Sequence, residues 1–388
     1  MTDQLGIQGD VRPEDEPLPF LSNFQDIFLS IGLIIFLVGI SILAVTIGES
    51  LITNSDTAPW VIAGLCGAVL AVVWVLSEVI VRKRRRILPG IILCVTFMWL
   101  IQAIGMNIYA GTFGERIEDD FDSIEWVDPD IDDSQVTHEA LRKVAASARD
   151  TLPWSAKGFF LAMPVLMLAG AFIYYRRFQL PFSSAMVGLS TISVAFTFLL
   201  FAFPYDILRF LPLIGFLSGL AMLIGGIHFD MRDPERVTRW SGNGFWLHFF
   251  AAPMLLSSVL FISYFGISFS VPDMVAGDFE FWEKNPFTVQ QSIVTLTIIG
   301  IFAVISLLLN RRALVVSGLV SAGIAIWIIV DATGLGGAQV AALTLILLGG
   351  GILFLGLGWN GARKMLLALV PSSGVWGRIF PRVDNVDG

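Results

Sequence analysis

Ionisable and hydrogen-bonding side chains gather in one short stretch of this sequence, between two long apolar runs. Residues 228–253 hold two of the chain's three histidines, together with three arginines and three acids. Histidine titrates near neutral pH and also ligates metals, so a histidine pair beside an aspartate has the chemistry of a proton relay or a partial metal site. The candidate binding residues of this stretch are His228, Asp230, Arg232, Arg236, Arg239, Asn243 and His248.

The same stretch also fits a purely structural interpretation. Asp233 before Pro234 and Glu235 is typical of a helix start, and Ser241 or Asn243 could cap the next spanning helix. The arginines would then meet lipid phosphates at headgroup depth. Two histidines and one aspartate are too few ligands for a metal site, and no CxxC or HExxH motif accompanies them. We therefore predict no metal, no cofactor and no catalytic set.

The composition indicates that membrane-spanning helices must position these residues. The chain has 388 residues, of which 55% are hydrophobic and 14% charged, whereas soluble domains carry about 25% charge. The net charge of −8 is not spread evenly, because acids concentrate in the N-terminal tail and in one loop while bases flank the apolar runs. No basic-aromatic patch is present, so we expect no nucleic-acid partner.

Apolar runs of membrane-spanning length cover most of the chain. A spanning helix needs about 20 mainly apolar residues, and about ten such runs can be found. They are approximately residues 27–47, 59–81, 87–111, 158–175, 183–203, 207–229, 245–268, 289–309, 313–330 and 340–358. The fold class that we predict is an all-α, polytopic transmembrane helical bundle of about ten spans.

Basic residues fall in every second connection, which predicts the orientation of the bundle. They occupy residues 82–86, 176–177, 232–239 and 311–312, and short basic loops stay on the cytoplasmic side. Both termini are then cytoplasmic. The predicted regions are an acidic cytoplasmic tail (1–26), spans 1–3 (27–111), an extracytoplasmic loop (112–157), spans 4–10 (158–358) and a cytoplasmic interfacial tail (359–388).

The large loop and the C-terminal tail each contain a predicted surface helix. Within the loop, apolar residues recur at helical spacing over residues 135–149, after an acidic run. Residues 128–139 have the ligand spacing of a calcium-binding EF-hand, but Asp133 replaces the required glycine, so a solvated acidic linker is our default. In the tail, residues 362–370 would form an interfacial helix whose Arg363 and Lys364 reach the headgroups.

Several spans contain residues that bend helices or bring them close together. Pro164, Pro212 and Pro253 lie inside the predicted fourth, sixth and seventh spans, and the fifth and seventh spans are rich in serine. Such residues either line a polar cavity or join helices by hydrogen bonds, and we favour the second interpretation. Gly215 with Gly219, and the glycines 349–351, predict close helix packing. Two cysteines fall at opposite membrane sides, so no disulfide is expected.

Residues 233–253 also carry a family resemblance. The runs DPERVTRWS and FWLHFFAAP resemble a signature of uncharacterised multi-pass inner-membrane proteins of proteobacteria, a family with no assigned activity. The resemblance implies a location in the bacterial inner membrane and implies nothing catalytic.

Three functions remain open from the sequence. The first is a transporter or permease for a small molecule or lipid, with a cavity among spans 4–7. The second is a non-catalytic scaffold or accessory subunit that binds membrane-protein partners through the 112–157 loop or the C-terminal tail. The third is an interfacial enzyme that uses His228, Asp230 and His248. The lipid bilayer is the expected partner in each case, and we favour the first function.

Overall fold

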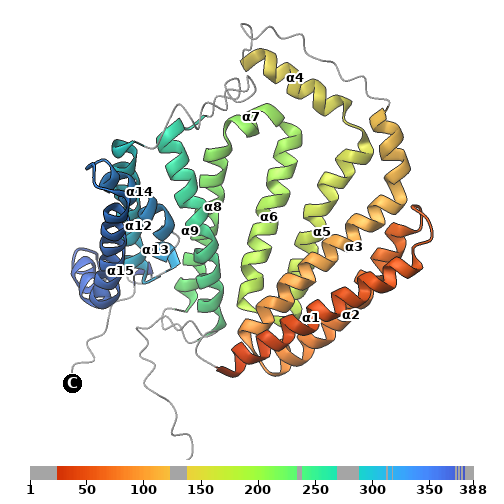
Figure 1. Ribbon diagram of the computed structural model, residues 1–388, viewed down its shortest axis with the longest axis horizontal. Coiled ribbons are helices and arrows are strands. Elements are labelled where there is room, and N and C mark those ends of the chain that lie inside the picture. The colour runs from red at the N-terminus through yellow and green to blue at the C-terminus, as the bar shows by residue number, and fades with distance from the viewer. Residues whose placement is uncertain are drawn as a thin grey trace, which may run out of the picture. The chain divides into compact units, whose positions relative to one another are not determined.

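The chain folds as helices throughout the part that the structure describes. The computed structural model describes residues 24–122, 138–233, 238–268, 288–311, 313–316, 318–371, 374, 376, 379 and 380. The chain divides into two compact units, one within residues 17–207 and the other formed mainly by residues 208–388. Figure 1 shows the helices of each unit, coloured by their order in the chain. The acidic run at 128–137 lies outside the described residues.

The first unit contains five long helices and one short surface helix. They are α1 (Phe24–Leu51), α2 (Ala58–Ser77), α3 (Ile87–Asp122), α4 (His138–Thr151), α5 (Trp154–Phe178) and α6 (Pro181–Ala202). A π-helical turn, η1 (Glu78–Lys83), continues α2. The short helix α7 (Pro204–Arg209) follows α6. In this unit α2 packs on α3, and α5 packs on both α3 and α6.

The second unit is organised around a tightly packed helix pair. Its helices are α8 (Leu211–Arg232), α9 (Arg239–Phe265), α12 (Val289–Leu309), α13 (Ala313–Val316), α14 (Leu319–Asp331) and α15 (Gly337–Leu367). The α8–α9 hairpin makes the most extensive contact, and α12 packs on α14, α15 and α9. The hairpin contains residues 228–248, so this unit holds the candidate site.

The described helices show that the chain is an integral, multi-pass membrane protein. Nine of them are long and apolar enough to cross a membrane. Many of their largest apolar side chains face outward; Leu357, for example, is 89% exposed within the chain. Side chains of this kind need an apolar solvent, which the bilayer supplies.

The predicted span at 313–330 is not one continuous helix in the structure. Its residues are divided between α13, with four residues, and α14, with 13 residues. At about 1.5 Å per residue, α14 covers roughly 20 Å, less than the roughly 30 Å of a hydrocarbon core. The count of ten spans therefore stays a prediction.

Two other predictions about the helices are wrong. Pro212 does not lie inside a span, because α7 ends before it and Pro212 occupies the first turn of α8, where proline is well tolerated. The 362–370 segment is not a separate helix, because α15 continues without interruption to Leu367 and Arg363 is buried. Further along the tail, Ile379 and Phe380 pack against Ala252 of α9 and Leu309 of α12.

The α4 helix confirms the short amphipathic helix predicted within residues 135–149. Leu141 is buried, Glu139, Arg142 and Lys143 are exposed, and Arg149 is half-buried. Arg142 forms an ion pair with Asp206 of α7, and this hydrogen bond raises the pKa of Arg142. His138 is hydrogen-bonded to Tyr205. These contacts hold α4 across the ends of the spanning helices of its unit (Figure 1).

Most serine and threonine hydroxyls in the spans donate a hydrogen bond to a backbone carbonyl one turn earlier in the same helix. Ser183 donates to the Leu180 carbonyl at 2.6 Å, and Ser257 donates to the Pro253 carbonyl at 2.7 Å. Thr191 makes the same kind of bond, to Val187. Such bonds satisfy the hydroxyls locally, so these residues give no support to a polar cavity.

An aromatic cluster holds α2, α3 and α5 together in the first unit. Tyr174 is fully buried, and its ring centroid lies 5.1 Å from that of Phe97 and 4.5 Å from that of Phe178. Its hydroxyl lies 3.1 Å from Ser77 Oγ. Ser77 already donates to the Val73 carbonyl at 2.8 Å, so the Tyr174 hydroxyl is the donor between the two side chains.

Tyr174→Phe is expected to lower the free energy of unfolding by about 0.6 kcal/mol, the average for a hydrogen bond between membrane helices. The ring contacts survive the change, so only the bond to Ser77 is lost. Equilibrium unfolding in mixed detergent micelles measures the effect. Adding Ser77→Ala to the Tyr174 variant should cost less than Ser77→Ala costs alone, and strictly additive losses would argue against the bond.

Candidate functional site

The packing of α8 on α9 explains how two residues of the candidate stretch meet. A Cβ added at Gly219 would lie 2.8 Å from Leu255 Cγ, and one added at Gly215 would lie 2.5 Å from Ser258 Oγ. The close packing predicted for this glycine pair is therefore confirmed. The glycines 349–351 differ, because an added Cβ there has no atom of the described residues within 4 Å. Their role in close packing stays a prediction.

Two further glycines make room for the polar side chains themselves. A Cβ at Gly226 would lie 2.8–2.9 Å from three atoms of the His248 imidazole. A Cβ at Gly244 would collide with the carboxylate of Asp230. Each helix of the hairpin thus lacks a side chain at the position that faces the functional group of the other helix. Asp230 and His248 can therefore meet inside the contact between the helices.

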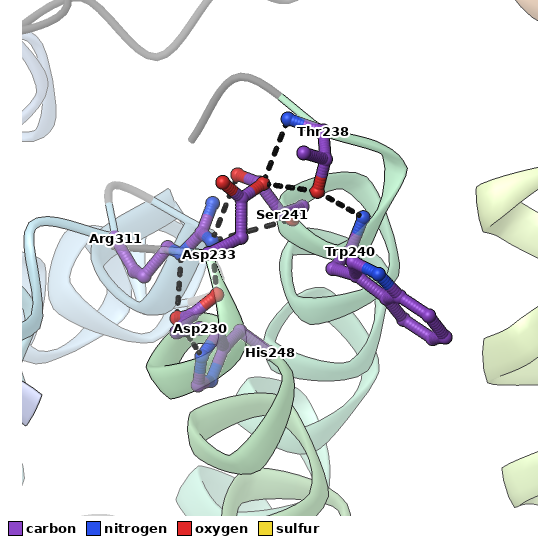
Figure 2. A network of polar contacts seen from close by, with 7 residues as sticks. All are labelled: Asp230, Asp233, Thr238, Trp240, Ser241, His248 and Arg311. Atoms are coloured by element: carbon purple, nitrogen blue, oxygen red, sulfur yellow. Dashed lines mark hydrogen bonds and ion pairs between the residues drawn. The ribbon is translucent and has the colours of Figure 1, made fainter. Parts of the chain in front are cut away.

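His248, Asp230 and Arg311 form one connected cluster, which we name the Asp230 cluster (Figure 2). His248 Nε2 lies 2.9 Å from Asp230 Oδ2. Arg311 Nε donates to the same oxygen at 3.1 Å, and Arg311 Nη2 donates to Asp230 Oδ1. Arg311 Nη2 also reaches the carbonyl of Ser241 at 3.3 Å. A two-pronged arginine–carboxylate bond of this kind is both strong and geometrically specific.

Burial gives this cluster its electrostatic importance. His248 is 0% exposed and Arg311 is 2% exposed, and the side chain of Asp230 is 12% exposed. With a neutral imidazole, the charges of Asp230 and Arg311 cancel. A carboxylate only accepts hydrogen bonds, so neutral His248 donates from Nε2 and keeps Nδ1 as its acceptor. A proton added there would leave one uncompensated positive charge in the packed helix bundle.

The C-terminal end of α12 places Arg311 against the hairpin. Asn310 caps this helix in the left-handed conformation (φ 52°), which asparagine tolerates better than most residues. Its side-chain oxygen accepts a hydrogen bond from Trp359 Nε1 at 3.0 Å. Arg311 N–H donates to the Ser306 carbonyl at 2.9 Å. The turn is thereby fixed on both sides, and α12 is connected to Asp230 through Arg311.

The other candidate residues are distributed differently. His228 is exposed on α8, with its ring against Phe229, and is not part of the Asp230 cluster. The guanidinium groups of Arg232 and Arg239 lie 5.7 and 5.2 Å from the centroid of the Trp240 ring. Asn243 is buried on α9. Arg236 lies outside the described residues.

The cap predicted for the seventh span is also corrected. Thr238, rather than Ser241 or Asn243, is the N-cap of α9, and its hydroxyl accepts from the Trp240 N–H at 3.3 Å. Asp233 accepts from both the backbone N–H and the hydroxyl of Thr238, at 2.8 and 2.6 Å. Asp233 therefore fixes the start of α9 from the end of α8 (Figure 2).

Among the described residues, no group of three or more histidine, cysteine, aspartate or glutamate side chains could hold a metal ion. Cys66 and Cys94 are free thiols, as expected from their sequence positions. Most of the calcium-like segment, residues 128–139, lies outside the described part of the chain.

Comparisons of the chain with protein-family models, with curated proteins and with solved structures return no match.

Proposed function

We propose that the chain is a transporter or permease for a small molecule or lipid in a bacterial inner membrane, with both termini cytoplasmic. The observation that carries the proposal is the completely buried His248, hydrogen-bonded to a carboxylate that also binds a buried arginine. Ionisable residues inside membrane-spanning helices are costly, and they commonly mark ion pathways and proton relays. A hydrogen bond that only holds two helices together does not require a histidine, because a serine or an asparagine can also make it.

The role that we assign to the Asp230 cluster is proton uptake coupled to helix movement. Neutral His248 and cationic Arg311 share the carboxylate of Asp230. A protonated His248 competes with Arg311 for that single negative charge and weakens the attachment of α12 to the hairpin. Histidine is the side chain whose unperturbed charge change falls between pH 5 and pH 8, which suits it to such a switch. Two states of the bundle would then differ in whether Arg311 stays bound.

The third function considered above, an enzyme that uses both histidines, has less support from the geometry. It requires His228 and His248 to act on one substrate at the cytoplasmic interface. His248 is buried between helices, whereas His228 is exposed. The two side chains therefore do not share an environment.

A flux assay tests the transporter proposal. Purified protein is reconstituted in liposomes that contain a pH-sensitive dye, and pools of amino acids, carboxylic acids, amines and short-chain lipids are added outside. We expect at least one pool to produce proton flux with the wild-type protein, and His248→Gln to abolish that flux.

His228→Gln is the matched control, since it makes the same chemical change on the exposed histidine of the same hairpin. Its flux should equal that of the wild type. The proposal is contradicted if no pool moves protons in the wild type, or if His248→Gln transports normally. It is also contradicted if both glutamine variants lose flux equally.

A further inference from the structure

A second feature, separate from the Asp230 cluster, is the basic turn between α2 and α3. We define the basic turn as residues 82–85, which read Arg-Lys-Arg-Arg. All four side chains are exposed. Arg176, at the end of α5, is exposed too. The positive-inside rule accounts for cations in such a loop, but it does not determine how they are arranged.

The backbone of the basic turn holds these cations in a defined conformation. The π-helical turn η1 widens the end of α2, and Arg84 N–H donates five residues back, to the Val79 carbonyl at 3.2 Å. Arg85 then adopts a left-handed conformation with φ 52°. Helices commonly end in this conformation, and glycine is the residue that favours it. The chain has an arginine at this position although its backbone geometry suits glycine.

The described acidic side chains next to the basic turn form ion pairs with other arginines or with Arg82. Glu78 accepts from Arg82 at 3.2 Å and from Arg177 at 2.6 Å, which joins the ends of α2 and α5. Asp26 of α1 accepts from Arg86 at 2.7 Å. In the described part of the chain, no acidic side chain pairs with Lys83, Arg84 or Arg85. Three exposed cations therefore stand next to each other without a counter-ion among the residues that the structure describes.

The position of the basic turn along its helix matches the depth of lipid headgroups. The candidate span runs over Ala58–Lys83, which is 26 residues. At about 1.5 Å per residue this helix is roughly 39 Å long, whereas the hydrocarbon core of a bilayer is about 30 Å thick. The last residues of the helix therefore emerge among the headgroups, where phosphate groups are the available anions.

We propose that Lys83, Arg84 and Arg85 form a binding site for the phosphate headgroup of an anionic phospholipid. Guanidinium groups bind phosphate oxygens with two parallel hydrogen bonds, and the ammonium of Lys83 adds a point charge. The ion pairs of Glu78 fix the end of α5 beside the site. The lipid occupies it from the leaflet on the side of the basic turn.

Lipid titration of the full-length protein in a neutral detergent tests this site, with bound lipid counted by native mass spectrometry. The probes are phosphatidylglycerol, phosphatidylcholine and inorganic phosphate. We expect the wild type to prefer phosphatidylglycerol. Each cation near an anionic lipid surface contributes about a fivefold factor in affinity. Lys83→Gln/Arg84→Gln should therefore weaken phosphatidylglycerol binding about 30-fold and leave phosphatidylcholine binding unchanged.

Two variants keep the test specific. Arg116→Gln/Lys143→Gln removes two exposed cations elsewhere in the same unit and should bind lipid as the wild type does. Arg85→Gly places the favoured residue at φ 52°; it should keep the fold intact and weaken lipid binding about fivefold. Equal losses in both double variants would overturn the site, as would unchanged affinity in the Lys83/Arg84 variant. Phosphate binding as tight as that of the lipid would overturn the lipid assignment.

Discussion

Replacing Asp230 with asparagine is expected to lower the free energy of unfolding by about 3–5 kcal/mol, because the change leaves the buried charge of Arg311 without its carboxylate. Arg311 is 2% exposed and donates to both oxygens of Asp230. An asparagine can accept only one of these bonds and carries no charge. Unfolding of the purified protein in mixed micelles, at a pH where Asp230 of the wild type is ionised, measures the loss.

Arg311→Gln separates the ion pair from the general packing around it. The single arginine substitution also removes one partner of a buried pair and should be clearly destabilising. Combined with Asp230→Asn, it leaves no unpaired charge, so the double variant should lose less than the sum of the two single losses. Purely additive losses, or an Asp230→Asn variant within about 0.5 kcal/mol of the wild type, would show that the two charges do not interact in a buried site.

Gly226→Ala should destabilise the protein relative to Gly225→Ala by about 1–3 kcal/mol, the usual effect of overpacking. The two glycines are neighbours within α8, so alanine brings the same gain in helix propensity at each. A Cβ at position 226 would lie 2.8 Å from the His248 ring, whereas one at 225 would lie 3.7 Å from Leu247 Cδ1. Only the first contact requires atoms to move.

The same pair of variants reports on the Asp230 cluster. If His248 moves to accommodate alanine at position 226, its hydrogen bond to Asp230 is stretched, and proton flux in liposomes should fall with stability. Gly225→Ala should retain both. Equal stabilities of the two variants would mean that α8 and α9 do not approach each other at Gly226 as the structure shows.

Long apolar helices could be predicted from hydropathy because their lengths are set by the bilayer. The span predicted at 289–309 agrees with α12, whose ends carry clear local signals. Thr288 and Gln291 form a capping box at its start, and Asn310 ends it. The span predicted at 313–330 is divided between α13 and α14 in the structure. Hydropathy could not reveal this division, because a continuous apolar run contains no signal for a break in the helix. At Pro212 the sequence does contain a signal for a break, but its position was misread. The helix ends before the proline, at Arg209, and Pro212 stands in the first turn of α8.

Two of the three residues of the Asp230 cluster, Asp230 and His248, are among the candidates that the sequence indicates. A short hairpin places the end of one helix beside the start of the next, which predicts both histidines close to Asp230. The structure brings only His248 to Asp230 and leaves His228 exposed. Arg311 lies 81 residues from Asp230 in the chain, and nothing local connects them. It stands in a basic pair after a spanning helix, where the orientation rule already explains an arginine. Because the positive-inside rule already accounts for Arg311, the sequence gives no reason to assign it a contact with Asp230.

The glycines that make room for the cluster could not be identified either. Among the glycines that the structure describes, Gly226 and Gly244 are distinguished by the polar side chains that face them across the helix contact. The register of α8 against α9 determines this, and a single sequence does not contain the register. Gly215 and Gly219 could be recognised because their four-residue spacing is itself a known packing signal.

The most direct test of proton uptake at the Asp230 cluster is a titration of His248 by nitrogen NMR. The protein, labelled with ¹⁵N at histidine and arginine, is placed in bilayers between pH 5 and pH 8, the range in which an unperturbed histidine changes charge. The His248 signals are those that disappear in His248→Gln. Proton uptake predicts that Nδ1 changes from an unprotonated to a protonated shift within this range, together with a change at the guanidinium of Arg311. A His248 ring that keeps one neutral tautomer over the whole range would contradict the account.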